Sequence, residues 1–241
     1  MLAAPQVQER RPKGQVMPSV DLRLYAILDP TRAKGRALPE LALAAVAGGA
    51  TLLQYRDKTG ETRALVETAR AIHAAIAGRG VPLLINDRID VALAAGAEGV
   101  HVGQSDMPAV DARRLLGPDA IIGLTLKTED HARHMAEAPV DYGCIGGVFA
   151  TVSKHNPEPP LGPEGFARVA AVARKAAPGK PVGAIAGIDA SNAASVIRAG
   201  ADGVAVISAL FMEDDVTAAT ARLRAIVDDA LAAQPAEATS R

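Results

Sequence analysis

The chain has 241 residues, of which 49% are hydrophobic and 2% aromatic, and its formal net charge is −1. This composition predicts one domain with a large aliphatic core, and it argues against a surface for nucleic acid or for an anionic membrane. The single cysteine, Cys144, excludes an internal disulfide and a cysteine-rich metal site and fits a cytoplasmic location, and there is no run of about 18 apolar residues to indicate a membrane span.

Residues 1–20 are expected to form a disordered tail. Arg10, Arg11 and Lys13 stand among prolines there, without the apolar segment of a secretion signal. Residues 234–241 have a similar character, and we expect a second disordered tail. The folded catalytic domain is therefore predicted to span residues 21–233.

Between these tails, short β-branched segments alternate with longer alanine-rich segments. The predicted strands are residues 22–28, 51–55, 82–85, 99–102, 121–124, 142–145, 182–185 and 204–207. The predicted helices are residues 38–47, 62–77, 90–95, 109–116, 129–137, 163–176, 191–198 and 214–233. This alternation indicates a parallel sheet, either a doubly wound open sheet or a closed barrel. Repeated Gly-containing turns between helix and strand favour a single (β/α)8 TIM barrel.

The second predicted strand runs into Gln54-Tyr55-Arg56-Asp57-Lys58. Alternation along an extended chain places Gln54, Arg56 and Lys58 on the same side. Barrel enzymes carry their chemistry at the carboxyl ends of the strands, where two cations and an amide would suit a polyanion such as a diphosphate. A solvated charged loop is the alternative interpretation.

The third predicted strand is followed by Asn86 and Asp87, and the fourth leads through His101 to Asp106. Carboxylates at the ends of adjacent strands can reach one hard cation, and Mg²⁺ prefers such ligands together with substrate phosphates and water. Alternatively, Asp87 and Asp106 only cap the helices that follow. His101 either faces the pocket or packs in the core.

The fifth predicted strand is followed by Thr125 and Lys127, and the sixth by Thr151 and Lys154. No helix is predicted for many residues after the sixth strand, and a polar loop of that length is typical of a functional or a disordered segment. Cys144 lies inside the sixth strand and is expected to be a buried, inert thiol.

The seventh predicted strand ends before Gly187 and the eighth before Ser208. The loops after these strands commonly bind phosphate in barrels, and a glycine permits close approach of the backbone. A glycine needed only for a tight turn is the alternative. The sequence thus predicts two anion-binding regions, a Mg²⁺-capable one on strands two to five and a phosphate cup on strands seven and eight.

These residues resemble the thiamine phosphate synthase family from about residue 25 to residue 211. The most specific matches, in chain order, are Gln54-Tyr55-Arg56-Asp57-Lys58, Asn86-Asp87-Arg88 and the segment GVHVGQSD at residues 99–106. The resemblance implies a (β/α)8 barrel transferase of thiamine biosynthesis that uses Mg²⁺. It would condense 4-amino-2-methyl-5-(diphosphooxymethyl)pyrimidine with 4-methyl-5-(2-phosphoethyl)thiazole, or its carboxylated form, to give thiamine phosphate and pyrophosphate.

The resemblance also implies a role for individual residues. The pyrimidine diphosphate would be bound by Gln54, Tyr55, Arg56, Asp57, Lys58, Asn86, Thr125 and Lys154. The thiazole phosphate would be bound by Thr151, Val152, Ser153, Gly187, Ile207 and Ser208. Mg²⁺ would be held by Asp87 and Asp106. Catalysis would rest on Arg56, Lys58 and Lys154, which stabilise the charge of the leaving group.

The chain departs from the family pattern at four places. Thr125 stands where Ser is frequent, Lys127 where His is usual, Ser153 where the Thr-x-Thr-Lys loop has its second Thr, and Ala186 where the family has the first of two glycines. Two alternatives stay open at this stage: a thiazole tautomerase of the same superfamily and a non-catalytic sensor of thiamine phosphate. The expected partners are small-molecule substrates, not nucleic acid or membrane, and the alanine-rich helix faces could pack in a homo-oligomer.

Overall fold

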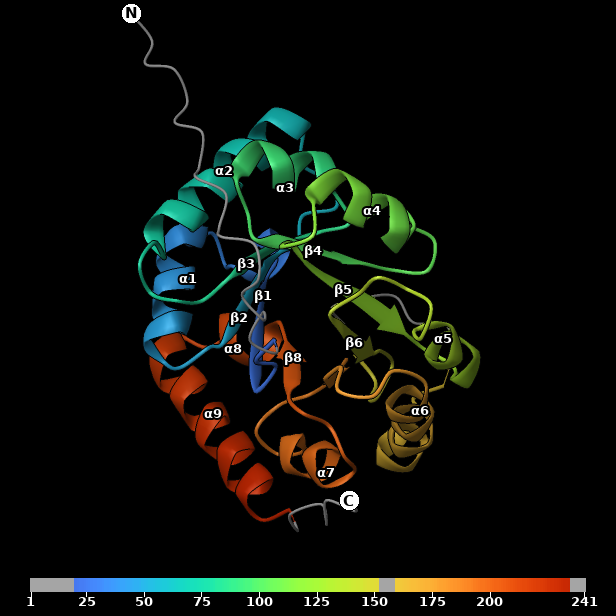
Figure 1. Cartoon of the computed structure of the whole chain (residues 1–241). Coiled ribbons are helices and arrows are strands. Elements are labelled where there is room, and N and C mark those ends of the chain that lie inside the picture. The colour runs from blue at the N-terminus through green and yellow to red at the C-terminus, as the bar shows by residue number, and fades with distance from the viewer. Residues whose placement is uncertain (1–19, 152–158, 235–241) are drawn as a thin grey trace, which may run out of the picture.

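A computed structural model describes residues 20–151 and 159–234 (Figure 1). Its parallel strands close into a barrel in the order β1-β2-β3-β4-β5-β6-β7-β8, which confirms the predicted TIM barrel over the open sheet. The strands are β1 (Leu24–Leu28), β2 (Leu52–Tyr55), β3 (Leu83–Asn86), β4 (Gly99–Val102), β5 (Ile121–Leu126), β6 (Tyr142–Ile145), β7 (Val182–Ile185) and β8 (Val204–Val206). Of the predicted tails, residues 1–19 and 235–241 lie outside the described residues, whereas Val20 packs against the core and Gln234 donates to the carbonyl of Ile197.

Helices surround the barrel on the outside, as Figure 1 shows. They are η1 (Pro30–Arg32), α1 (Leu38–Ala47), α2 (Thr62–Ala75), α3 (Ile89–Ala95), α4 (Ala109–Leu116), α5 (Glu129–His134), α6 (Gly162–Ala176), α7 (Ala193–Arg198), α8 (Ser208–Phe211) and α9 (Val216–Ala232). The 3-10 turn η1 and the short helix α8 were not predicted, because three or four residues are too few to show a helical period. None of the described helices is long and apolar enough to cross a bilayer.

Alternation along the strands divides the core into two layers. Side chains that point outward, such as Leu53 and Val100, pack against the helices in the larger cluster. Side chains that point inward, such as Tyr25, Leu84 and Tyr142, fill the barrel in a second cluster. The middle of the barrel is therefore filled by side chains, and a cavity opens above them toward the carboxyl ends of the strands.

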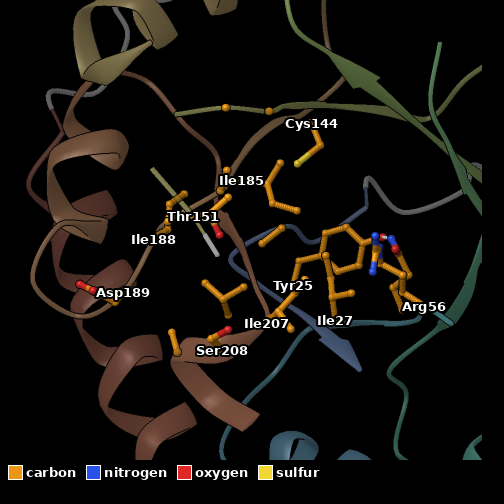
Figure 2. A pocket seen from close by; sticks show the side chains of 18 of the residues that line it. Tyr25, Ile27, Arg56, Cys144, Thr151, Ile185, Ile188, Asp189, Ile207 and Ser208 are labelled. Carbon is orange, nitrogen blue, oxygen red and sulfur yellow. Dashed lines mark hydrogen bonds between the residues drawn. The ribbon is translucent and has the colours of Figure 1, made fainter. Parts of the chain in front are cut away.

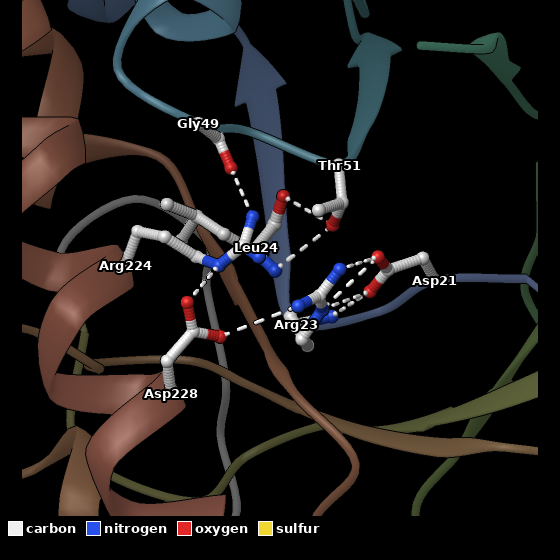
Figure 3. Close-up of polar contacts among 7 residues, drawn as sticks. All are labelled: Asp21, Arg23, Leu24, Gly49, Thr51, Arg224 and Asp228. Carbon is white, nitrogen blue, oxygen red and sulfur yellow. Dashed lines mark hydrogen bonds and ion pairs between the residues drawn. The ribbon is translucent and has the colours of Figure 1, made fainter. Parts of the chain in front are cut away.

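The amino ends of the strands are closed by a repeated polar arrangement, shown for β1 in Figure 3. A side chain one or two residues before each even-numbered strand accepts a hydrogen bond from a backbone N–H of the first or second residue of the preceding strand. The pairs are Thr51 with Leu24 (3.0 Å), Glu98 with Leu83 (2.8 Å), Asp141 with Ile122 (2.7 Å) and Asp202 with Val182 (2.7 Å). A basic side chain from a neighbouring helix completes each unit. His73, Arg113 and Arg174 pair with Glu98, Asp141 and Asp202, and Arg224 donates to the carbonyl of Gly49, two residues before Thr51. These contacts connect the amino ends of the strands to the helix layer. In TIM barrels the functional site lies at the opposite end, at the carboxyl ends of the strands.

Candidate active site

A cavity of about 800 Å³ opens at the carboxyl ends of the strands. Figure 2 shows that its middle is apolar, with Tyr25, Ile27, Ile185 and Ile207 directed into it. Arg56 lies at one end, and Ser208 lies with Thr151 and Asp189 at the other. The cavity thus has two polar ends separated by an apolar middle. This shape suits flat rings that carry charged groups at both ends.

Eight of the residues that the sequence singled out for substrate binding line this cavity. They are Gln54, Arg56, Asn86, Thr125, Thr151, Gly187, Ile207 and Ser208. They come from β2, β3 and β5 and from the segments after β6, β7 and β8. Closure of the barrel is what brings these distant segments to one place. Val152, Ser153 and Lys154 lie outside the described residues.

Two residues of the second-strand motif turn away from the cavity. Tyr55 is buried in the outer layer against the helices. Asp57 accepts hydrogen bonds from the backbone N–H groups of Thr59 and Gly60, both at 2.9 Å. Burial alone would raise the pKa of Asp57, but these backbone donors lower it, so the carboxylate stays ionised and shapes the loop. Neither side chain is placed to bind substrate, because strand alternation points both outward.

Arg56 is held by an acid that sequence reasoning missed. Asp29 follows β1, is 4% exposed, and places its Oδ2 2.5 Å from Nη1 of Arg56. The other oxygen of Asp29 accepts from the backbone N–H of Thr31 at 2.9 Å and so caps η1. The guanidinium is therefore fixed at the mouth by a buried carboxylate from the neighbouring strand. No sequence motif identified Asp29, since a single Asp before Pro also reads as a turn residue.

The two predicted metal ligands lie close together at the ends of β3 and β4. Asp87 accepts from Nδ2 of Asn86 at 2.7 Å and from the ammonium of Lys58. Asp106 accepts from the backbone N–H of Gly103 at 2.7 Å. Burial and the neighbouring carboxyl of Asp87 raise the pKa of Asp106. Neither acid is among the residues that line the cavity, although Asn86, which contacts Asp87, is. Two acids that repel one another favour the binding of a cation between them.

The backbone at Asp87 is strained. Its φ is +60°, a value that residues other than glycine rarely adopt, and its N–H donates to the carbonyl of His101 at 2.9 Å. Strain of this kind costs of order 1–3 kcal/mol and persists where the surroundings impose it, often at functional sites. Here the carboxylate contacts the ammonium of Lys58, which likewise is not among the residues that line the cavity. Within the described residues no group of three or more His, Cys, Asp or Glu could hold a metal.

Beneath the cavity, a chain of hydrogen bonds crosses the barrel. Gln54 donates from Nε2 to the hydroxyl of Tyr25, which also accepts from the hydroxyl of Tyr142 at 3.0 Å. His101 places Nδ1 2.9 Å from the Tyr142 hydroxyl and Nε2 2.9 Å from Oγ1 of Thr125. Since the Tyr142 proton is directed to Tyr25, Nδ1 of His101 is the donor and Nε2 accepts from Thr125.

This chain settles the place of His101, which sequence reasoning left open. Its ring is 8% exposed, lines the cavity and packs edge-on to Tyr25. Burial is the main reason that the pKa values of Tyr25 and Tyr142 are raised far above that of a free phenol, so both hydroxyls stay neutral. The chain therefore orients Gln54 and Thr125 at its two ends through phenol hydroxyls that stay neutral.

The opposite end of the cavity is built by two loops that cross. Backbone N–H groups of Val148 and Phe149 donate to the carbonyls of Ile185 and Ala186 at 3.3 and 3.0 Å. A Cβ added to Gly187 would lie 2.3 Å from the carbonyl oxygen of Ala150, so only glycine fits this crossing. The side chain of Asn192 donates to the Gly187 carbonyl at 2.8 Å, another contact that no sequence signal revealed.

Comparison with known proteins identifies relatives of this chain. A family model described as thiamine monophosphate synthase matches residues 24–210. A curated thiamine-phosphate synthase from Agrobacterium fabrum is 57% identical over 218 residues, covering 90% of this chain and 99% of the relative. Another, from Albidiferax ferrireducens, is 47% identical over 207 residues, covering 86% of this chain and 92% of the relative.

Solved structures agree with the sequence comparison. The thiamine phosphate pyrophosphorylase of Pyrococcus furiosus superposes with a TM-score of 0.77 at 34% identity, covering 88% of this chain and 98% of that one. A 3-hexulose-6-phosphate synthase superposes with a TM-score of 0.60 at 20% identity, covering 85% of this chain and 99% of that one. At that identity, the second likeness extends only to the barrel fold.

Proposed function

The chain belongs to the thiamine monophosphate synthase family, and from this premise we propose how its cavity performs the reaction. The activity is thiamine-phosphate synthesis, a transferase reaction of thiamine biosynthesis. We assign the substrates as the aminopyrimidine diphosphate and the thiazole phosphate. The observation that carries this assignment is the form of the cavity, with a cationic end, an apolar middle and a second polar end.

The pyrimidine diphosphate is assigned to the end that contains Arg56, Asn86 and Thr125. Arg56 offers guanidinium donors there while it is paired with Asp29, and Gln54 lines the same end from β2. Lys58, paired with Asp87, keeps the role that the resemblance implies. Nε2 of Gln54 is occupied by Tyr25, so its carbonyl oxygen remains to accept from the amino group of a pyrimidine. Lys154, outside the described residues, keeps the role that the resemblance implies.

Asp87 and Asp106 fit a Mg²⁺ ion. They offer hard carboxylate oxygens from adjacent strand ends, and their mutual repulsion would be relieved by a divalent cation. A site with two protein carboxylates is typical of Mg²⁺ that completes its shell with water and substrate phosphate. When bound, the ion would neutralise charge that develops on the departing pyrophosphate.

The thiazole phosphate is assigned to the opposite end. Gly187, Ile207 and Ser208 line it, Thr151 lies close by, and Ser208 begins α8. Backbone N–H groups of a glycine-containing loop can approach a phosphate closely. Val152 and Ser153 stay predictions, since both lie outside the described residues.

The bond changes need little from the protein in the way of acid or base. The C–O bond between the pyrimidine methylene and the diphosphate breaks, and its electron pair leaves with pyrophosphate. The ring amino group delocalises the positive charge on the methylene, and the lone pair of the thiazole nitrogen forms the new C–N bond. The chain's own residues hold the two reactants in line and stabilise the leaving group. The reaction therefore requires no nucleophile or base among the residues that line the cavity.

Pyrophosphate release from the two substrates, with and without Mg²⁺, tests this proposal. We expect thiamine phosphate to form only with Mg²⁺, and Asp87→Ala to abolish its formation. Asp214→Asn serves as the control, because that side chain is fully exposed and, among the described residues, pairs with Lys34 alone, at 3.2 Å. Turnover of the thiazole phosphate alone in the presence of a chelator would instead support the tautomerase, and tight binding of thiamine phosphate without turnover the sensor.

The proposal also includes the location of the protein in the cell and its oligomeric state. We expect the protein in the cytoplasm, on the ground of its single, buried cysteine. A homo-oligomer remains a prediction, which size-exclusion chromatography with light scattering would test.

A further inference from the structure

Lys127 lines the cavity but is not among the residues assigned to either substrate. It follows β5, where Thr125 faces the interior, and alternation directs Lys127 to the same side. Its backbone N–H donates to Nδ1 of His131 at 3.3 Å, and Oγ1 of Thr128 caps α5 by accepting from the His131 N–H at 3.2 Å. The residue is therefore held in place at the cavity wall.

Among the described residues, no carboxylate forms an ion pair with the ammonium of Lys127. Its side chain is half-buried and lines the cavity, and it forms no ion pair there. The other cations on this side differ: Arg56 pairs with Asp29, and Lys58 pairs with Asp87. An ammonium that is partly withdrawn from water without a counter-charge favours the binding of an anion.

The neighbours of Lys127 indicate which anion it meets. Thr125, one step below on the same strand, is linked through its carbonyl to Nε2 of Gln104 at 2.7 Å, in the loop that also carries Asp106. On the other side, Gly146 and Gly147 line the cavity and leave it open. The strand before the Asp106 loop, β4, pairs directly with β5, whereas the loops of the thiazole-phosphate end follow β7 and β8, two and three strands further round the barrel. Lys127 thus follows the strand next to the one that leads to Asp106, and it is further in strand order from the second phosphate than from that carboxylate.

We propose that Lys127 binds the diphosphate of the pyrimidine substrate and the pyrophosphate formed from it. The inference rests on the proposed function, since it takes the diphosphate to lie against Asp87 and Asp106. Arg56 and Lys58 are each neutralised by a carboxylate, so Lys127 supplies net positive charge to this end of the cavity. Such charge stabilises the leaving group as the C–O bond breaks.

Calorimetric binding of inorganic pyrophosphate in the presence of Mg²⁺ tests the proposal without turnover. Lys127→Met keeps an unbranched apolar side chain and removes the charge, so we expect affinity to fall about 10- to 100-fold, as for loss of a hydrogen bond to a charged group. Lys127→Arg should bind within about threefold of the wild type, because a cation is retained. Lys175→Met, exposed on α6 and away from the cavity lining, is the charge-matched control and should bind as the wild type does.

Steady-state kinetics then separate the two substrates. For Lys127→Met we expect a higher KM for the pyrimidine diphosphate and weaker product inhibition by pyrophosphate, with the KM for the thiazole phosphate unchanged. Unaltered pyrophosphate affinity in Lys127→Met, or a loss confined to the thiazole phosphate, would overturn the proposal. A wild type that binds pyrophosphate through Lys127 but forms no thiamine phosphate would refute the proposed function and leave the Lys127 contact standing.

Discussion

Asp29 and Arg56, which are separated by 27 residues, are joined across two neighbouring strand ends by a contact of 2.5 Å between Oδ2 and Nη1. The carboxylate is almost completely buried, while the guanidinium reaches the cavity. A charged hydrogen bond to a buried acid restricts the arginine to one orientation. Asp29 therefore acts on the reaction through Arg56, as a positioning residue.

Asp29→Asn should lower kcat about tenfold, with the KM for the pyrimidine diphosphate unchanged or lower. The arginine keeps its charge and can still attract the diphosphate, but it loses the orientation on which transition-state stabilisation depends. Steady-state kinetics with each substrate in turn measure the two constants. A rise in KM at constant kcat would show that Asp29 serves binding only, and Asp214→Asn again provides the control.

Ala186→Gly should stabilise the protein by about 1 kcal/mol. Ala186 has a φ of +93°, which is unfavourable for any residue with a Cβ, and replacement by glycine removes that strain. Gly187→Ala should do the opposite, because its φ is +65° and a Cβ would collide with the Ala150 carbonyl. Urea unfolding of both variants provides the test, and a less stable Ala186→Gly would show that the methyl group packs usefully.

Tyr142→Phe should destabilise the fold by about 1–3 kcal/mol, since it leaves buried partners in the barrel without a hydrogen bond. The lost hydroxyl contacts both Tyr25 and His101. Tyr25→Phe and the double variant complete a cycle, and the two costs should not add, because the residues belong to one chain of bonds. Additive free energies of unfolding would contradict a coupled chain.

The thiol of Cys144 should resist alkylation in the native protein. Burial raises its pKa to about 12, so the thiolate is scarce at pH 8, and we expect labelling on the order of a thousandfold slower than in denaturant. The raised pKa favours the native state below the ordinary thiol pKa, and this contribution is lost as pH rises toward the native value. Native labelling should therefore accelerate about tenfold per pH unit. A rate equal to that of the denatured chain would contradict this environment.

Much of the site was predictable from sequence, because strand alternation is a local property. The period of two placed Gln54 and Arg56 on one side, and both line the cavity. The same period explains why Tyr55 and Asp57, although inside the most specific motif, turn away from it. The alternation of strands and helices predicted a parallel sheet, and the glycine-rich turns favoured a closed barrel.

Only the tertiary structure disclosed the contacts that cross the barrel. The hydroxyls of Tyr25 and Tyr142 meet over a sequence separation of 117 residues, and each residue alone is merely one more large side chain in a buried strand. The ion pair between Asp29 and Arg56 likewise depends on the pairing of β1 with β2. The sequence determined which residues face inward, since that follows from backbone geometry within a strand. Which of them meet was decided by the closure and register of the barrel, because those bring together strand ends that no local pattern relates.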